Sequence, residues 1–218
     1  MADWLNSQHT QVDLLRHGAC EGGEIFRGST DVALSEEGWN QLRLSTADLN
    51  WDQIVCSPLI RCQHFAQELS QKLDIPLHVD ARWREFHFGE WEGMLRSDVW
   101  AERGEEILQF YSDPSSFTPP GGDSFEDVSK RLADAWKELI DTHQGKRVLV
   151  VTHAGIFRTI YSKLQSLPTT AFNSVEIPFA CLSRWKVFHN SDESNSPDSA
   201  SPLTMLSFHN RQVAGPVT

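Results

Sequence analysis

The stretch that decides the fold is Arg147-Val148-Leu149-Val150-Val151-Thr152-His153-Ala154-Gly155. Its unbroken apolar run, Val148–Val151, is typical of a buried strand. His153 follows at the carboxyl end of this strand, and Ile156–Leu164 is predicted to be a helix. Open α/β sheets bind their ligands beyond the carboxyl ends of the strands, so His153 is a candidate for a functional site.

A second segment of this kind lies near the start of the chain. Val12–Leu15 is a short, mostly apolar run that ends in Arg16-His17-Gly18. It is predicted to be a buried strand followed by a tight turn. His17 therefore also follows a strand end, although it lies far from His153 in the sequence, and the two would meet at one edge of a shared sheet.

Further strands and helices alternate along the chain. Strands are predicted at Gln53–Ser57, Leu77–Val79, Cys181–Phe188 and Leu203–Phe208, and helices after the N-caps Ser35, Ser57 and Ser124 and at Glu102–Tyr111. This order predicts an α/β fold: a three-layer sandwich with a mostly parallel central sheet, helices on both faces and a small cap built from insertions.

Size and composition suit a single domain over residues 1–218. We expect its cap at roughly 89–123 and a flexible hairpin tip at 190–202, a segment rich in Ser, Asp and Pro without a large apolar residue. The 218 residues are 39% hydrophobic and carry a net charge of −11, so the chain as a whole should repel nucleic acid and anionic lipid. An anionic substrate would need local arginines to overcome this field.

The expected compartment is a reducing cytoplasm. The four cysteines form neither a C-x-x-C motif nor a dense disulfide pattern. Met1–Thr10 lacks the basic and apolar regions of a signal peptide, and Val148–Val151 is far too short to span a bilayer.

Four segments carry residues that could do chemistry. His17 could be a nucleophile, and Arg61, in the first turn of a helix after Ser57-Pro58, could bind phosphate with its guanidinium fork. Glu85 stands among aromatic residues, where burial would favour the neutral form that a general acid needs. His153 could stabilise charge on a phosphoryl group. Taken singly, each is more often a structural or surface residue, and Glu90 and Glu92 compete with Glu85 for the acid role.

These segments, in this order from about Val12 to Ile160, resemble the histidine phosphatase superfamily, which has the phosphoglycerate-mutase-like fold. The resemblance implies catalytic roles for His17 as the nucleophile, Glu85 as the proton donor and His153, and a phosphate pocket of Arg16, Arg61 and His153. It implies a phosphohistidine intermediate, with no cofactor and no metal. The histidines also lack HExxH or Cys/His ligand spacing.

One departure lies just after Arg16-His17-Gly18. Many members carry a phosphate-contacting Asn where this chain has Gly23, so that contact is absent or made by backbone. Cys20 is interpreted as a small wall residue of the pocket rather than a reactive thiol.

Within the superfamily, Phe26–Asp31, Leu34–Trp39 and Phe88–Gly93 look closest to the α-ribazole phosphatases of cobalamin assembly. The resemblance implies α-ribazole 5′-phosphate as substrate. Arg27 is either a substrate contact or a surface arginine. Some of Trp83, Phe86, Phe88 and Trp91 could form a flat apolar wall for the ring, and the alternative is that most of them pack into the core. A phosphatase of another small phosphomonoester, a phosphoglycerate mutase and a catalytically weak regulatory binding module are the alternatives. The expected partner is a small phosphorylated metabolite, with no nucleic acid and no membrane, and a homodimer stays open.

Overall fold

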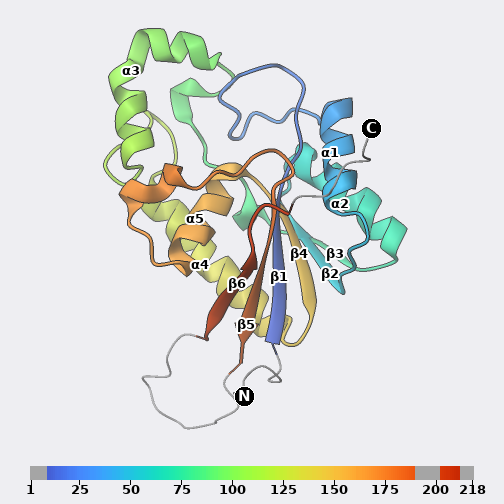
Figure 1. The fold of residues 1–218 in the computed structure, drawn as a ribbon. Coiled ribbons are helices and arrows are strands. Elements are labelled where there is room, and N and C mark those ends of the chain that lie inside the picture. The colour runs from blue at the N-terminus through green and yellow to red at the C-terminus, as the bar shows by residue number, and fades with distance from the viewer. Residues whose placement is uncertain (1–8, 190–201, 212–218) are drawn as a thin grey trace.

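A computed structural model describes residues 9–189 and 202–211. Its centre is a six-stranded sheet in the order β3-β2-β4-β1-β5-β6 (Figure 1). The strands are β1 (His9–Arg16), β2 (Gln53–Cys56), β3 (Leu77–Val79), β4 (Arg147–Thr152), β5 (Leu182–Phe188) and β6 (Thr204–Phe208). The first four run parallel, β5 is antiparallel to β1, and β6 is antiparallel to β5. The predicted α/β class and mostly parallel sheet are confirmed.

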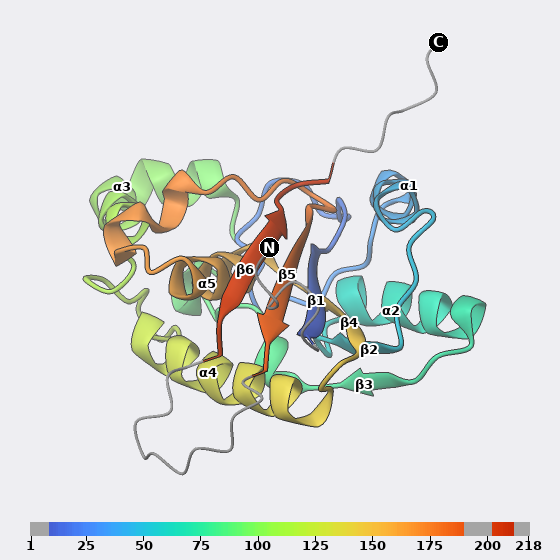
Figure 2. The same cartoon turned by 60° about the horizontal axis from the view of Figure 1, so that its bottom comes forward.

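Helices cover both faces of this sheet (Figure 2). The helices α1 (Glu36–Ser45) and α2 (Ile60–Leu73) lie on one side, and α4 (Phe125–Thr142) and α5 (Ala154–Leu164) on the other. Alternate residues of β4 explain the arrangement, because Val148 and Val150 join the core under α4 and α5 whereas Leu149 and Val151 join the core under α1 and α2. The apolar run of β4 is therefore buried from both faces, as parallel sheets require.

A third core cluster lies outside the sandwich. It consists of Phe26, Trp91, Val99, Ile107 and Phe110, and it packs beneath α3 (Arg96–Ser112), the helix at the top left of Figure 1. This helix begins six residues before the predicted start and bends at Arg103, whose φ and ψ are −135° and 37°. Short 3-10 turns complete the fold at Ala81–Trp83 (η2), Gly89–Trp91 (η3) and Thr169–Ser174 (η4). The division into one domain with a cap at 89–123 stays a prediction.

Two of the three predicted N-caps are confirmed. The Ser35 hydroxyl accepts from the Gly38 amide, and the Ser124 hydroxyl accepts from the Asp127 amide. The prediction for Ser57 is wrong, because α2 begins at Ile60 and its first amide donates to Asp31 Oδ1 at 2.8 Å. The Ser57 hydroxyl instead forms a hydrogen bond with His153.

Several expectations concern the ends and the edges. The paired edge strands are confirmed as β5 and β6. The predicted hairpin tip 190–202 lies outside the described residues except for Pro202. No helix in the described part of the chain is long and apolar enough to cross a membrane. All four cysteines are free thiols.

Candidate active site

The register of the sheet brings the two candidate histidines together. Arg16 pairs with Thr152 across the parallel strands β1 and β4, so the next residues, His17 and His153, leave neighbouring strand ends side by side. Their ring centroids are 5.3 Å apart. Strand β2 ends on the other side of β4, which puts the Ser57 hydroxyl 2.7 Å from Nε2 of His153. The site thus lies at the carboxyl ends of three parallel strands.

His17 is buried and neutral. Burial, with the nearby guanidinium groups of Arg61 and Arg16, holds the pKa of His17 well below its usual 6.5. Its Nδ1 lies 2.8 Å from the Gly18 carbonyl, and since a carbonyl only accepts, Nδ1 carries the proton and donates. The Nε2 lone pair is therefore available as a nucleophile.

The turn after His17 requires glycine at two positions. A Cβ on Gly18 would lie 2.2 Å from the Gly38 carbonyl oxygen, and a Cβ on Gly38 would lie 1.9 Å from the Ala19 carbonyl oxygen. Helix α1 can therefore approach the turn closely and fix the direction of the His17 ring. Cys20 lies in the same turn, with Sγ 3.5 Å from His17 Nδ1, and burial raises the pKa of its thiol.

Arg16 is fixed but keeps an unused donor. Its Nη1 donates to the Ile177 carbonyl at 2.6 Å, and its guanidinium lies over the Phe179 ring, 4.1 Å from the centroid. Its Nε is buried and has no hydrogen-bond partner among the described residues. Burial first, and then the charge of Arg158, lowers the pKa of Arg16 to about 10. A buried, unpartnered N–H is costly and suits an anionic ligand.

Arg61 and His153 form a buried pair behind His17. Arg61 donates from Nε to His153 Nδ1 at 3.2 Å, and its terminal nitrogens donate to the carbonyls of Gly28 and Thr30 at 2.6 and 3.0 Å. Because arginine never accepts, His153 carries its proton on Nε2 and donates it to Ser57. Burial and Arg61 hold the pKa of His153 well below 6.5.

Glu85 is held by two backbone amides. Its Oε1 accepts from Phe86 N and its Oε2 accepts from Gly155 N, both at 3.0 Å. The loop that carries it is anchored on β4, because Thr152 Oγ1 donates to the Trp83 carbonyl at 2.9 Å. A Cβ on Gly155 would lie 2.6 Å from Glu85 Oε1, so the glycine allows this carboxylate to approach α5.

The two rival carboxylates lie elsewhere. Glu90 forms an exposed ion pair with Arg103 at 2.8 Å. Glu92 accepts from the amides of Ser29, Thr30 and Phe88, and so ties two loops together. Burial alone would raise the pKa of Glu92, but these hydrogen bonds outweigh it and lower the pKa. Among the three candidates, Glu85 alone lines the cavity described next.

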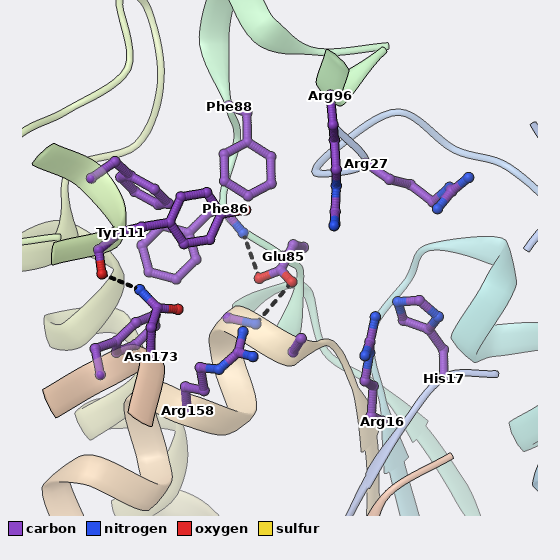
Figure 3. Close-up of a pocket in the computed structure, with 14 residues that line it drawn as sticks. Arg16, His17, Arg27, Glu85, Phe86, Phe88, Arg96, Tyr111, Arg158 and Asn173 are labelled. Carbon is purple, nitrogen blue, oxygen red and sulfur yellow. Dashed lines mark hydrogen bonds between the residues drawn. The ribbon is translucent and has the colours of Figure 1, made fainter. Parts of the chain in front are cut away.

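A cavity of about 80 Å³ contains the predicted residues Arg16, His17, Arg27 and Glu85 (Figure 3). Arg61 and His153 do not line the cavity. The His153 ring contacts the His17 ring, and Arg61 donates to His153. Arg27 donates from Nη2 to the carbonyls of Glu21 and Gly23 at 2.9 and 2.6 Å and so closes the turn that contains Gly23.

Sequence reasoning missed several lining residues. Arg96 comes from the start of α3, Arg158 from α5, Tyr111 from the end of α3 and Asn173 from η4. Asn173 donates to the Tyr111 carbonyl at 2.6 Å and so fixes η4 against α3. No local motif marks these residues, because only the packing of α3, α5 and η4 against one another brings them to one cavity.

Two of the four aromatic residues considered for the wall line the cavity, and the other two pack into the core. Trp83 and Trp91 are 1% and 0% exposed and belong to core clusters. Phe86 and Phe88 do line the cavity, and Phe110, Tyr111 and Phe172 join them. Among the described residues, no group of three or more His, Cys, Asp or Glu could hold a metal ion.

Comparisons with known proteins identify the family of the chain. The family model for the histidine phosphatase superfamily (branch 1) matches residues 12–196. The bifunctional protein Rv2228c of Mycobacterium tuberculosis is 35% identical over 150 residues, which cover 66% of this chain and 41% of that protein, so this chain spans less than half of that relative. The adenosylcobalamin/alpha-ribazole phosphatase of Salmonella typhimurium is 25% identical over 175 residues, 78% of this chain and 87% of the relative. The native structure of mycobacterial glucosyl-3-phosphoglycerate phosphatase Rv2419c has a TM-score of 0.81 at 25% identity and covers 94% of this chain and 100% of its own.

Proposed function

The chain belongs to the histidine phosphatase superfamily, and on this premise we propose that it hydrolyses a small phosphomonoester through a phosphohistidine at His17. One observation carries the proposal: a neutral histidine with a free Nε2 shares a cavity with an unpartnered arginine N–H and a carboxyl group. These are the nucleophile, the anion-binding donor and the acid–base group of a phosphoryl transfer.

The first step transfers the phosphoryl group to the enzyme. His17 Nε2 attacks phosphorus, the bond from phosphorus to the ester oxygen breaks, and the leaving oxygen takes a proton from Glu85. In the second step, water attacks the phosphohistidine and gives its proton to Glu85. The N–P bond then breaks, which releases inorganic phosphate and restores neutral His17.

The arginines provide charge for the transferring group. Arg16 Nε and Arg27 Nε are buried donors of the cavity that have no hydrogen-bond partner among the described residues. Arg61 and His153 are proposed to complete the phosphate pocket, and this role requires them to exchange their present bonds to Gly28, Thr30 and Ser57 for the phosphoryl oxygens. Burial, and then the charge of Arg61, hold the pKa of both histidines well below 6.5, so both are neutral before phosphate binds.

The substrate is a finer question than the chemistry. Names of relatives support two kinds of ester: α-ribazole phosphatase at 25% identity, and glucosyl-3-phosphoglycerate phosphatase at the same identity. For α-ribazole 5′-phosphate, Phe88 and Phe110 at the cavity could stack on the ring, a contact worth about 0.5–1.5 kcal/mol. We keep this ester as a candidate, together with an unrelated small phosphomonoester. The free thiols suit a reducing cytoplasm as the place of action.

Trapping the intermediate tests the proposal. The enzyme should be mixed with a ³²P-labelled phosphomonoester and quenched in base within milliseconds. The expected result is a label that is stable to base, labile to acid and mapped to the peptide that contains His17. Hydrolysis without any such label, at quench times shorter than one turnover, would contradict a covalent route.

A substrate panel should follow with α-ribazole 5′-phosphate, a nucleoside 5′-monophosphate and 3-phosphoglycerate. Poor turnover of the ribazole ester beside fast turnover of another ester would remove the cobalamin role. Efficient interconversion of phosphoglycerates in the presence of 2,3-bisphosphoglycerate would favour a mutase instead. If the chain were instead a regulatory binding module, it would turn over none of these esters.

A further inference from the structure

Arg96 and Arg158 line the cavity and have no task in the proposed reaction. Arg96 and Arg158 come from different helices, α3 and α5, and both line the same cavity as His17. In Figure 3, Arg96 enters from above and Arg158 from below, and Glu85 lies between them. The group that leaves with the proton of Glu85 would therefore depart between two guanidinium groups.

Arg158 is built into the wall of the cavity. Its Nε donates to the Val175 carbonyl at 3.1 Å, and Figure 3 shows its guanidinium directed toward Glu85. Burial lowers the pKa of Arg158, whereas the charge of Glu85 acts in the opposite direction. The Nε bond fixes the plane of the guanidinium, so the terminal nitrogens are oriented for a ligand before it arrives.

Arg96 is weakly engaged by the protein. Its side chain is 52% exposed, and the ion pair with Glu24, itself 82% exposed, is long at 3.8 Å. Its guanidinium also lies 5.9 Å from the centre of the Phe26 ring. An exposed pair of this length contributes little free energy, so Arg96 can turn to a ligand at small cost.

The charges of the cavity do not balance. Arg16, Arg27, Arg96 and Arg158 line it, whereas Glu85 is the one acidic residue of the lining. The whole chain, by contrast, carries a net charge of −11. After burial, the largest influence on the pKa of Arg16 is repulsion by Arg158. A phosphate dianion at His17 offsets two positive charges. The positive charge that remains, near Glu85, can then bind an anionic group in another part of the substrate.

We propose that Arg96 and Arg158 form a second anion-binding site, and that the natural substrate is a phosphomonoester whose leaving group carries a carboxylate near the ester oxygen. This inference rests on the proposed function, since it assumes that phosphate is bound at His17. Guanidinium groups bind carboxylates with paired, charge-assisted hydrogen bonds. An uncharged leaving group such as α-ribazole would offer neither arginine a carboxylate.

A matched pair of substrates tests the second site. 3-Phosphoglycerate and glycerol 3-phosphate share the phosphate and the carbon skeleton, and differ mainly in a carboxylate against a hydroxymethyl group. The wild-type enzyme should prefer 3-phosphoglycerate in kcat/KM by about tenfold or more, the effect expected of one hydrogen bond to a charged group. In Arg96→Gln and in Arg158→Gln, this ratio should fall about tenfold.

The matched control is Arg103→Gln, which removes the same charge from α3 but acts on an ion pair with Glu90 outside the cavity. It should leave the substrate ratio unchanged. Because Arg158 also contacts Val175, its variant could fail to fold, and the exposed Arg96 then decides the question alone.

The outcomes separate the two proposals. The second site is overturned if the wild type has an equal kcat/KM for both esters, or if the ratio is unchanged in Arg96→Gln. In either case, turnover of one of the esters still supports the proposed phosphatase. An equal loss on both esters would assign the arginines to the transferring phosphoryl group, and this also overturns it. No phosphohistidine with any ester would remove the proposed function itself.

Discussion

Replacing Glu85 by glutamine changes the proposed acid without changing its volume. Glutamine keeps one acceptor oxygen, but its amide nitrogen is a donor, whereas both Glu85 oxygens accept from backbone amides, Phe86 N and Gly155 N. One of these buried amides therefore loses its acceptor and meets another donor. The variant should lose both stability and the proton of the reaction.

The two losses can be estimated separately. Leaving a buried amide donor without an acceptor costs about 1–3 kcal/mol, and for a chain of this size the Tm falls by about 2–4 °C per kcal/mol, so the Tm should drop by about 2–12 °C. General acid catalysis contributes about 10²–10⁴ to the rate. kcat/KM for an alkyl phosphate should fall by this factor, because an alkoxide needs the proton as it leaves. For p-nitrophenyl phosphate, whose leaving group is stable as an anion, the fall should stay within about tenfold.

A stopped-flow assay distinguishes the two steps of the reaction. Glu85→Gln should still release p-nitrophenol in a burst of one equivalent and then turn over slowly, because water must be activated without a base. Glu90→Gln is the matched control, since Glu90 forms an exposed ion pair outside the cavity. It should match the wild type in both assays. An equal fall of kcat/KM for both leaving groups would refute the acid role and leave Glu85 a structural residue.

Four further predictions follow from the same geometry. His17→Ala should lower turnover by several orders of magnitude and abolish the acid-labile label, and near-normal hydrolysis would exclude His17 as the nucleophile. His17 and His153 have pKa values below 6.5 in the folded state, so the unfolded chain binds more protons as the pH falls through about 6.5. The free energy of unfolding should therefore be highest above that pH and decline below it. In thermal melts between pH 7.5 and 5.5, the His17→Asn variant should lose less stability than the wild type. An equal loss in both proteins would show that His17 does not contribute. Activity should survive EDTA, since the arginines supply the positive charge, and a loss restored by Mg²⁺ or Zn²⁺ would contradict this. Gly155→Ala places a Cβ 2.6 Å from Glu85 Oε1 and so should displace this carboxyl group. Displacing a catalytic group by about 1 Å costs about 10²-fold, so kcat/KM for alkyl phosphates should fall by that factor. Unchanged kinetics would show that Glu85 tolerates the shift.

The sequence by itself determined the layers of the fold and the position of the proposed nucleophile. The run Val148–Val151 has apolar side chains at every position, and only a strand covered on both faces buries all of them. Arg16-His17-Gly18 and His153-Ala154-Gly155 follow such strands, so their meeting at one edge of the sheet was predictable from local patterns. The caps at Ser35 and Ser124 were predictable for the same reason, since each depends on residues within one helical turn.

The tertiary structure alone decided which carboxylate and which arginines reach the cavity. Glu85, Glu90 and Glu92 lie within eight residues and have similar neighbours in the sequence. Glu85 contacts Gly155 and lines the cavity, Glu90 pairs with Arg103 at the surface, and Glu92 contacts Thr30 where two loops meet. Ser57 is likewise not a cap, because α2 begins only at Ile60, and the Ser57 hydroxyl accepts from His153, which lies 96 positions away. Arg96 and Arg158 carry no local signal at all. Their direction follows from long-range packing, in which α3, α5 and η4 meet over the ends of β1 and β4, and the pattern of neighbouring residues contains no record of such contacts.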